Sequence, residues 1–198
     1  MQGPYYLAST SPYRAALLER LGLPFIVEAP DVTEAVRPGE AAAARALRLA
    51  DAKAQAVAAR HRAAWVLGAD QVAECEGRLL DKPGDADRSR AQLQAFSGRA
   101  VRFHTAAVLA RGLPAAAFRH VDCTTVRFRQ LAGEDIARYV ERDRPYDCTG
   151  SFRCEGLGIA LCDAIESSDP TALIGLPMIW VARALRQAGL DPLAASLS

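Results

Sequence analysis

The sequence predicts an α/β protein in which helices flank a mixed sheet. Short apolar runs alternate along the chain with segments of helical periodicity, and this order is typical of the fold class. The 198 residues, of which 51% are hydrophobic and 24% charged, suffice for a buried core without disulfide bonds. We therefore expect one domain over residues 1–198, either a single compact body or two closely joined lobes.

The N-terminal elements are marked by clear start and stop signals. Tyr5–Ala8 is an apolar run that predicts a short strand. A helix should follow, because Ser11 is a good N-cap and Pro12 suits the first helical position. Gly22 ends this helix, and Pro24–Ala29 predicts the second strand.

A long helix and a buried strand are expected next. Pro30–Gly39 is a loop, and the Ala-rich segment Glu40–His61 carries charges at helical intervals. Trp65–Val72 is apolar on both faces, which is typical of a strand buried on both sides. Turns are expected at Gly77 and at Asp81–Gly84.

The second half of the chain repeats the alternation of helices and strands. Its helices are expected at Asp87–Phe96, Gly133–Arg142 and Pro177–Gly189, with Ser97-Gly98 closing the first of them. Its strands are expected at Ala100–Ala110, Phe118–Phe128 and Leu157–Ile165, the first two joined by a turn at Gly112–Pro114.

Charge and composition exclude several classes of function. The formal net charge is +1, from 24 Lys and Arg against 23 Asp and Glu, which disfavours nucleic-acid binding. No run is apolar enough to span a bilayer and no secretory signal is visible, so we expect no membrane contact and a cytoplasmic location. The five cysteines form no Cys-x-x-Cys pair, and we expect reduced thiols rather than a zinc site.

The segment Ser9-Thr10-Ser11-Pro12-Tyr13-Arg14 is the first candidate site. A strand leads through hydroxyl residues into a helix N-terminus, where free N–H groups and the helix dipole favour a phosphate. Arg14 can fold back toward the same anion. The alternative is an ordinary N-cap beside a surface arginine.

Lys53 and Asp70 are the next candidates. Lys53 shares a helix face with Leu49 and Val57, so it either meets a buried partner or extends past small alanines to water. Asp70 follows an apolar run near the expected end of a strand, where a carboxylate can act as a general base or bind a metal. The alternative for Asp70 is a residue that starts a turn.

Two loops carry further candidates. Lys82 precedes Pro83, which stiffens its backbone, and Glu155 lies in a loop bracketed by glycines. Taken alone, Lys82 is better explained as an exposed loop lysine, and the alternative for Glu155 is an ordinary loop.

Together and in this order, these segments resemble the Maf family of nucleoside triphosphate pyrophosphatases, in its YceF-like branch. The resemblance covers nearly the whole chain. Its motifs are Leu7–Arg14, Arg48-Leu49-Ala50 with Lys53-Ala54, Leu67–Val72, Asp81-Lys82-Pro83, Ser97-Gly98, Thr105-Ala106, Gly150-Ser151-Phe152, Glu155–Gly158 and Gly175-Leu176-Pro177.

The resemblance implies both a fold and an activity. The fold would be elongated and two-lobed, similar to inosine triphosphate pyrophosphatases, with the active site in the cleft between the lobes. The reaction would cleave a nucleoside triphosphate between its α- and β-phosphates, with Mg²⁺, Mn²⁺ or Co²⁺. A homodimer is compatible with the family.

Roles for individual residues follow from the same resemblance. Asp70 would be the general base and a metal ligand, and Glu34 a second metal ligand. The phosphates would be bound by Ser9, Ser11, Arg14, Lys53 and Lys82.

Tyr13, Gln71 and Glu155 indicate the substrate. These positions match the branch that acts on 7-methyl-GTP, whereas the branch acting on dTTP and UTP usually has Arg, Thr and Gln. An aromatic face suits the cationic 7-methylguanine ring, and a carboxylate can accept from guanine N1–H and its amino group. Tyr13 replaces a tryptophan found in similar proteins, and Ala15 replaces a common second arginine. The alternatives are a dTTP/UTP pyrophosphatase and a nucleotide-binding regulator of cell division.

Overall fold

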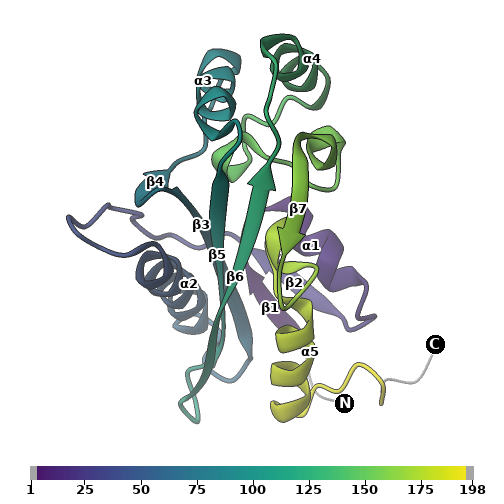
Figure 1. The fold of residues 1–198 in the computed structure, drawn as a ribbon. Helices are drawn as coiled ribbons and strands as arrows, with labels where there is room; N and C mark the ends of the chain where they lie inside the picture. Colours follow the sequence, from purple (N-terminus) through teal and green to yellow (C-terminus); the bar gives the residue numbers. More distant parts are fainter. Residues whose placement is uncertain (1–3, 195–198) are drawn as a thin grey trace. The chain divides into compact units, whose positions relative to one another are not determined.

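The computed structural model describes residues 4–194 and confirms the α/β class (Figure 1). Its seven strands form one mixed sheet in the order β2-β1-β3-β5-β6-β7, with β4 paired to β3. Within residues 4–194 no helix combines the length and hydropathy needed to cross a membrane. Contacts divide the described chain into two compact units. The first contains the residues up to Asp70, Thr105–Asp122 and those from Asp169 onward; the second contains Gln71–His104 and Cys123–Ser168.

The first unit is built on three parallel strands. They are β1 (Tyr5–Ala8), β2 (Phe25–Glu28) and the start of β3 (Val66–Cys75). In this register Leu7 of β1 lies opposite Val27 of one neighbour and Leu67 of the other.

Three helices cover this sheet on its two faces. They are α1 (Pro12–Glu19) and α5 (Met178–Gln187) on one face and α2 (Ala42–Ala58) on the other (Figure 1). Tyr5 and Leu7 pack in one cluster with α1 and α5, whereas Ala8 packs with α2. Alternate residues of a strand point to opposite faces, so four residues of β1 supply both layers of the core.

The second unit holds the remaining elements and the distal parts of three long strands. Its complete elements are β4 (Arg78–Leu80), α3 (Ala86–Phe96), α4 (Gly133–Asp143) and β7 (Cys162–Glu166). Strands β3, β5 (Ala100–Arg111) and β6 (Ala116–Phe128) each contribute residues to both units. Short 3-10 helices occur at Thr149–Ser151, Leu157–Leu161 and, in the first unit, Ala172–Ile174.

Two sequence predictions about strands were wrong. Leu157–Ile165 is a strand only in its last part, because Leu157–Leu161 forms a 3-10 helix. The Leu157 N–H donates to Asp143 Oδ2 at 2.7 Å, so a side chain of α4 takes the place of a strand partner. Strand β3 also runs beyond Val72, because it continues into a hairpin with β4 through Glu76 and Gly77, both at positive φ.

This longer strand changes the setting of Asp70. The carboxylate lies in the middle of β3, and not near its end as predicted. However, the parallel pairing of β1 with β3 ends at Ala8 and Gly68, so Asp70 lies just beyond the end of its shorter neighbour.

Gly68 allows α2 to approach β3 closely. A Cβ atom at this glycine would lie 2.6 Å from the Ala54 amide nitrogen and would also meet the Ala50 carbonyl oxygen. Backbone atoms cannot move aside as a flexible side chain can. Gly68 and Asp70 are two residues apart and share a strand face, so this close packing brings α2 to the carboxylate.

We expect Gly68→Ala to lower the free energy of unfolding by about 2 kcal/mol, because the added methyl group forces α2 away from β3. Urea unfolding would measure the change. Gly133→Ala is the matched control, since nothing lies within 4 Å of its Cβ position, and its stability should stay equal or rise by less than about 1 kcal/mol. Equal stability in both variants would contradict the close approach.

Candidate active site

The turn after β1 gathers hydrogen-bond donors around Ser9. Ser9 is 3% exposed, and its Oγ accepts from the Ser11 N–H at 3.1 Å and from Arg14 Nη1 at 3.3 Å. Ser11 caps α1 by accepting from the Arg14 N–H at 3.4 Å, and Pro12 follows it as predicted. Arg14 therefore folds back over the helix N-terminus instead of extending into solvent.

Lys53 and Asp70 form a buried ion pair on the α2 face of the sheet. Lys53 Nζ lies 2.6 Å from Asp70 Oδ1, and the two residues are 8% and 7% exposed. The sequence left open whether Lys53 meets a partner or reaches water. The structure shows the partner.

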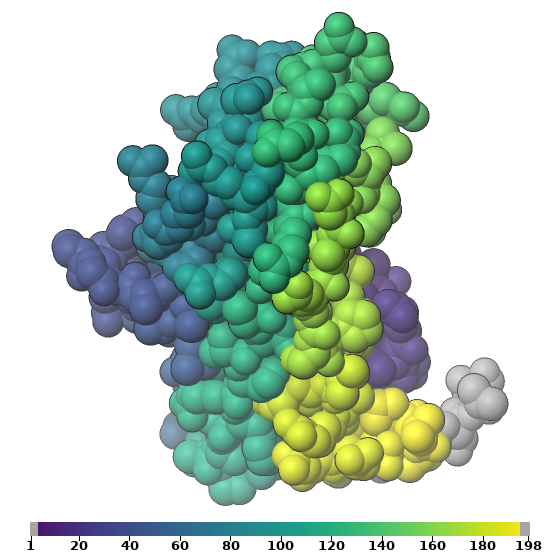
Figure 2. All heavy atoms as spheres, viewed as in Figure 1, coloured from purple at the N-terminus to yellow at the C-terminus, as the bar shows by residue number. Residues whose placement is uncertain are grey.

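Glu34 approaches the same ammonium from the loop between β2 and α2. Its Oε1 lies 2.6 Å from Lys53 Nζ, while about half of its side chain is exposed. Residues 33–39 of this loop are exposed, and their blue-violet atoms lie at the left margin of the space-filling view (Figure 2). Two carboxylates thus converge on one lysine, one from the core and one from the surface.

The surroundings of Asp70 make its carboxylate unusually basic. Burial raises the pKa of Asp70, and the negative charge of Glu34 raises it further, while Lys53 and Arg14 act in the opposite direction. Burial also lowers the pKa of Arg14, against the effect of Asp70 and Glu34. A carboxylate with a raised pKa is a stronger proton acceptor, as general-base catalysis requires.

A loop far along the chain fixes Arg14. The Gly175 carbonyl oxygen accepts from Arg14 Nε at 3.1 Å, and a Cβ at Gly175 would lie 3.4 Å from the Arg14 side chain. The loop is itself anchored, because the buried Thr105 hydroxyl donates to the Ala172 carbonyl at 2.9 Å. Thr105 and Gly175 both lie in motifs that carry the family resemblance, but neither residue had a predicted role.

Asp169 and Thr171 hold the other end of this loop to α5. Asp169 is 3% exposed and accepts from the Thr171 N–H at 2.9 Å and the Ile179 N–H at 2.7 Å. The Thr171 hydroxyl accepts from the Met178 N–H at 3.0 Å. Sequence reasoning missed both residues, although Asp and Thr two residues apart before a Gly and a Pro are a recognisable turn signal.

The structure brings together the predicted site residues of the first unit. Ser9, Ser11 and Arg14 are hydrogen-bonded to one another, and Lys53 pairs with both Asp70 and Glu34. The charges of Asp70 and Glu34 act on the pKa of Arg14, which connects the two groups electrostatically. Tyr13 is half-buried in the first turn of α1.

The other three predicted residues belong to the second unit, where each has its own surroundings. Lys82 is exposed in the segment before α3, and Gln71 follows Asp70 on β3. Glu155 is an exposed residue whose carboxylate lies 3.6 Å from Arg153 Nε. Their part in the same site stays a prediction.

The carboxylates of Glu34 and Asp70 suit a divalent cation that takes its remaining ligands from the phosphates of a substrate. No group of three or more His, Cys, Asp or Glu residues gathers as a metal site within residues 4–194. Mg²⁺, however, commonly uses one or two protein carboxylates and completes its shell with phosphate oxygens and water. Glu34 and Asp70, which both contact Lys53 Nζ, are the residues that could hold such an ion.

Comparison with known proteins identifies the family. The family model described as Maf-like protein matches residues 4–188. The chain belongs to the Maf-like family.

Similar proteins align over nearly the whole chain. A protein of Xanthomonas axonopodis pv. citri (strain 306) is 55% identical over 93% of this chain and 96% of its own length. A protein of Bordetella pertussis is 51% identical over 94% and 93%, and one of Albidiferax ferrireducens 48% identical over 98% of both chains. Each of these relatives is named 7-methyl-GTP pyrophosphatase.

Among solved structures, the Staphylococcus aureus Ham1 protein aligns with 64% of this chain and 72% of its own. The TM-score is 0.46 at 13% identity. A similarity of this size does not by itself establish a common fold, so the resemblance to inosine triphosphate pyrophosphatases stays a prediction.

Lys53→Met would leave the Asp70 carboxylate buried without its nearest cation. We expect the free energy of unfolding to fall by about 3 kcal/mol at pH 8. The pKa of Asp70, already raised by burial, should rise further, so the folded variant would hold this proton to a higher pH than the unfolded chain. The loss should therefore shrink as the pH falls below that pKa, which urea unfolding at several pH values would measure.

The double variant Lys53→Met/Asp70→Asn is the control for this experiment. It removes the buried charge itself, so most of the stability should return and the added pH dependence should disappear. A loss that is the same at every pH would argue against an uncompensated carboxylate.

Thr105→Val keeps the side-chain shape but removes the donor that anchors the Gly175 loop. Because Arg14 loses a fixed partner, we expect KM for a nucleoside triphosphate to rise about threefold to tenfold in steady-state assays. Thr124→Val is the matched control: Thr124 is equally buried and contacts the Ser167 hydroxyl in the second unit. An equal rise of KM in both variants would show a general effect on folding.

Proposed function

We propose that this protein hydrolyses 7-methyl-GTP to 7-methyl-GMP and diphosphate and so removes a modified nucleotide. The observation that carries the proposal is the buried Lys53–Asp70 pair, which sets a carboxylate of raised pKa beside a cation suited to a phosphate. Membership of the Maf-like family and the names of relatives at about 50% identity support the choice of substrate.

The proposed reaction assigns a separate task to each residue. Asp70 takes a proton from a water molecule, whose oxygen forms a bond to the α-phosphorus. The bond from that phosphorus to the bridging oxygen breaks, and diphosphate leaves with the electron pair. Lys53, Arg14 and the N–H groups at the start of α1 stabilise the charge that develops on the phosphate oxygens.

The charge balance of the site supports a requirement for a divalent cation. Arg14 and Lys53 are matched by Asp70 and Glu34, so these four side chains together carry almost no net charge. A triphosphate brings about four negative charges, which need further compensation. We propose that Mg²⁺, Mn²⁺ or Co²⁺ is bound by Glu34 and Asp70 together with the phosphates, and that Lys82 adds a third cation. The metal would polarise the phosphoryl group.

We assign base recognition to Tyr13, Gln71 and Glu155. Tyr13 would stack on the cationic 7-methylguanine ring, and Glu155 would accept from its N1–H and amino groups. Ser9 and Ser11 would contact the phosphates. Ala15, in place of an arginine, leaves the phosphate contacts to fewer residues than is usual in the family.

We propose that the enzyme acts in the cytoplasm, where nucleotide pools lie. We also propose that it forms a homodimer. Nucleic acid is not a partner in this proposal, in line with the net charge of +1. The competing functions are dTTP/UTP hydrolysis and nucleotide binding without turnover. The second is disfavoured by Asp70, since a pure binder needs no general base.

The deciding experiment measures diphosphate release from 7-methyl-GTP, GTP, dTTP, UTP and CTP with each of the three metals. We expect 7-methyl-GTP to be preferred. Preference for dTTP or UTP would keep the mechanism and overturn the proposed substrate. Absence of turnover with every combination of nucleotide and metal would favour a nucleotide-binding regulator.

Asp70→Asn should lower kcat for the preferred substrate at least about 100-fold while the protein stays folded, because the amide cannot accept the proton. Circular dichroism and nucleotide affinity would establish that fold and binding persist. Asp51→Asn is the matched control, as Asp51 is an acid on α2 in the first unit, where it pairs with Arg119. Near-normal turnover in Asp70→Asn would remove Asp70 as the base.

Glu155→Gln should reduce the preference for 7-methyl-GTP over dTTP about tenfold in kcat/KM, because an amide cannot accept both guanine hydrogen bonds. Glu166→Gln, which removes an exposed acid of the same unit, serves as the control. An unchanged preference would exclude Glu155 from base recognition.

A further inference from the structure

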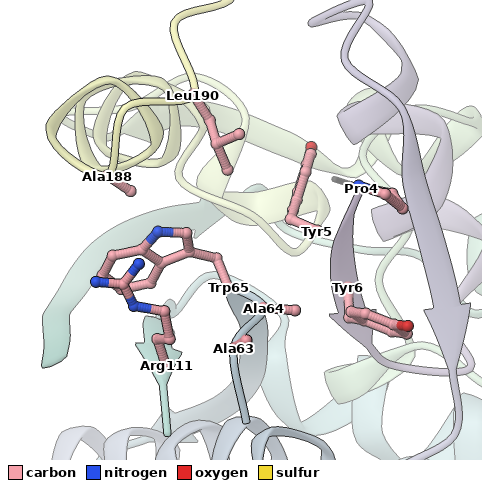
Figure 3. Close-up of a pocket in the computed structure, with 9 residues that line it drawn as sticks. All are labelled: Pro4, Tyr5, Tyr6, Ala63, Ala64, Trp65, Arg111, Ala188 and Leu190. Carbon is pink, nitrogen blue, oxygen red and sulfur yellow. The ribbon is translucent and has the colours of Figure 1, made fainter. Parts of the chain in front are cut away.

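A cavity of about 450 Å³ in the first unit has an aromatic and mostly apolar lining (Figure 3). Among the described residues that line it, Arg111 is the one with a charge, and its guanidinium carbon lies 4.6 Å from the centroid of the Trp65 ring. Arg111 ends β5 and Trp65 directly precedes β3, so this cation–π contact ties two strands together. The packing of the sheet accounts for this wall, whereas a network in the second unit is connected to predicted site residues.

Gln92 of α3 joins two segments of the second unit, and each segment carries a predicted site residue. Its Nε2 donates to the carbonyl oxygen of Asp81 at 3.0 Å, and Asp81 directly precedes Lys82. Its Oε1 accepts from the hydroxyl of Ser151 at 2.6 Å, and Ser151 lies shortly before Glu155 in the chain. One amide side chain therefore holds the segment of Lys82 and the segment of Glu155.

Ser151 has a backbone conformation that residues other than glycine seldom adopt. Its φ is 55°, in the left-handed region, and the residue is fully buried. The Ser151 hydroxyl donates to Gln92, while the Ser151 carbonyl oxygen accepts from the Tyr139 hydroxyl at 3.1 Å. Side chains of two adjacent helices, α3 and α4, thus keep this strained residue in place (Figure 1). Strain that is maintained by several contacts indicates that the path of the loop matters.

Helix α4 fixes the chain on both sides of Glu155. The Arg153 N–H donates to the Tyr139 hydroxyl oxygen at 3.0 Å, and the Leu157 N–H donates to Asp143 Oδ2 at 2.7 Å. Tyr139 and Asp143 are four residues apart, so they lie on one face of α4. The Tyr139 hydroxyl is also the group that donates to the strained serine, so the constraint on that serine extends to the loop of Glu155.

We infer that Gln92 is a positioning residue that couples phosphate binding to base selection. The inference rests on the proposed function, in which Lys82 binds a phosphate and Glu155 binds the base. The hydrogen bonds of Gln92 reach Asp81 and Ser151, so Gln92 acts through the backbone that presents each of these groups. A nucleotide that meets both groups loses less freedom on binding when their separation is already fixed.

Three variants separate the two hydrogen bonds of Gln92. Ser151→Ala removes only the hydroxyl, so the preference for 7-methyl-GTP over dTTP should fall about threefold in kcat/KM while KM for dTTP stays near normal. Gln92→Glu keeps an acceptor for Ser151 but sets a carboxylate oxygen against the Asp81 carbonyl. KM should then rise about threefold for both nucleotides with little change of preference. Gln92→Leu removes both bonds and should show both effects.

Two controls distinguish positioning from a general effect on the fold. Gln94→Leu changes an exposed glutamine of the same helix, so it should alter neither KM nor preference. In the Glu155→Gln background, Gln92→Leu should lower the preference no further, because its effect on base selection passes through the carboxylate already removed.

Hydrogen exchange tests the same network without a substrate. In protein labelled with ¹⁵N, the Arg153 amide should exchange about tenfold faster in Gln92→Leu than in the wild type, because the loop loses the bond that holds Ser151. Gln94→Leu should leave this rate unchanged.

Three results would overturn the inference while the proposed function stands. Equal changes in Gln92→Leu and Gln94→Leu would show a general effect on α3. A further fall of the preference in the Glu155→Gln background would show that Gln92 does not act through Glu155. Faster exchange with unchanged KM and preference would show a bridge that has no part in binding. Absence of turnover by the wild type with every nucleotide is a different result, since it would overturn the proposed function and the positioning role with it.

Discussion

The buried ion pair between Lys53 and Asp70 is the constraint on which the candidate site depends. A lysine and an aspartate that are both less than 10% exposed are tolerated because their charged atoms lie 2.6 Å apart. That distance requires α2 to lie directly on β3. Gly68 permits this, because any larger residue would meet the backbone of Ala50 and Ala54. A glycine two residues from the catalytic candidate thus determines where its partner lies.

Arg14 connects the turn after β1 with the loop before α5. Its guanidinium reaches Ser9 on one side and the carbonyl of Gly175, 161 residues away, on the other. Thr105, Asp169 and Thr171 hold the loop that presents this carbonyl. They fix the direction of a flexible cation before a ligand arrives, which reduces the entropy lost on binding.

The electrostatics of the candidate site bear on how the proposed binding residues could also serve catalysis. Cations that bind a triphosphate would ordinarily depress the basicity of a neighbouring carboxylate. Here burial outweighs Lys53 and Arg14, and the pKa of Asp70 is raised. Glu34 contributes in the same direction from the exposed loop. The candidate site therefore keeps a proton acceptor beside Lys53 and Arg14, the cations proposed to bind the phosphates.

The sequence by itself determined the fold class and most element positions, and it pointed to the candidate site residues. Local signals sufficed for the Ser11 cap and Pro12, and helical periodicity placed Lys53 on the buried face of α2. Only the tertiary structure decided that Asp70 is the partner of Lys53, that β3 continues past it, and that Leu157–Leu161 is helical. It alone revealed Thr105, Asp169 and Thr171 as supports of the loop that contacts Arg14, and the cavity lined by Trp65 and Arg111. The physical reason is that periodicity and capping act over a few residues, whereas ion pairs, loop anchors and cavities are made by residues that only folding brings together.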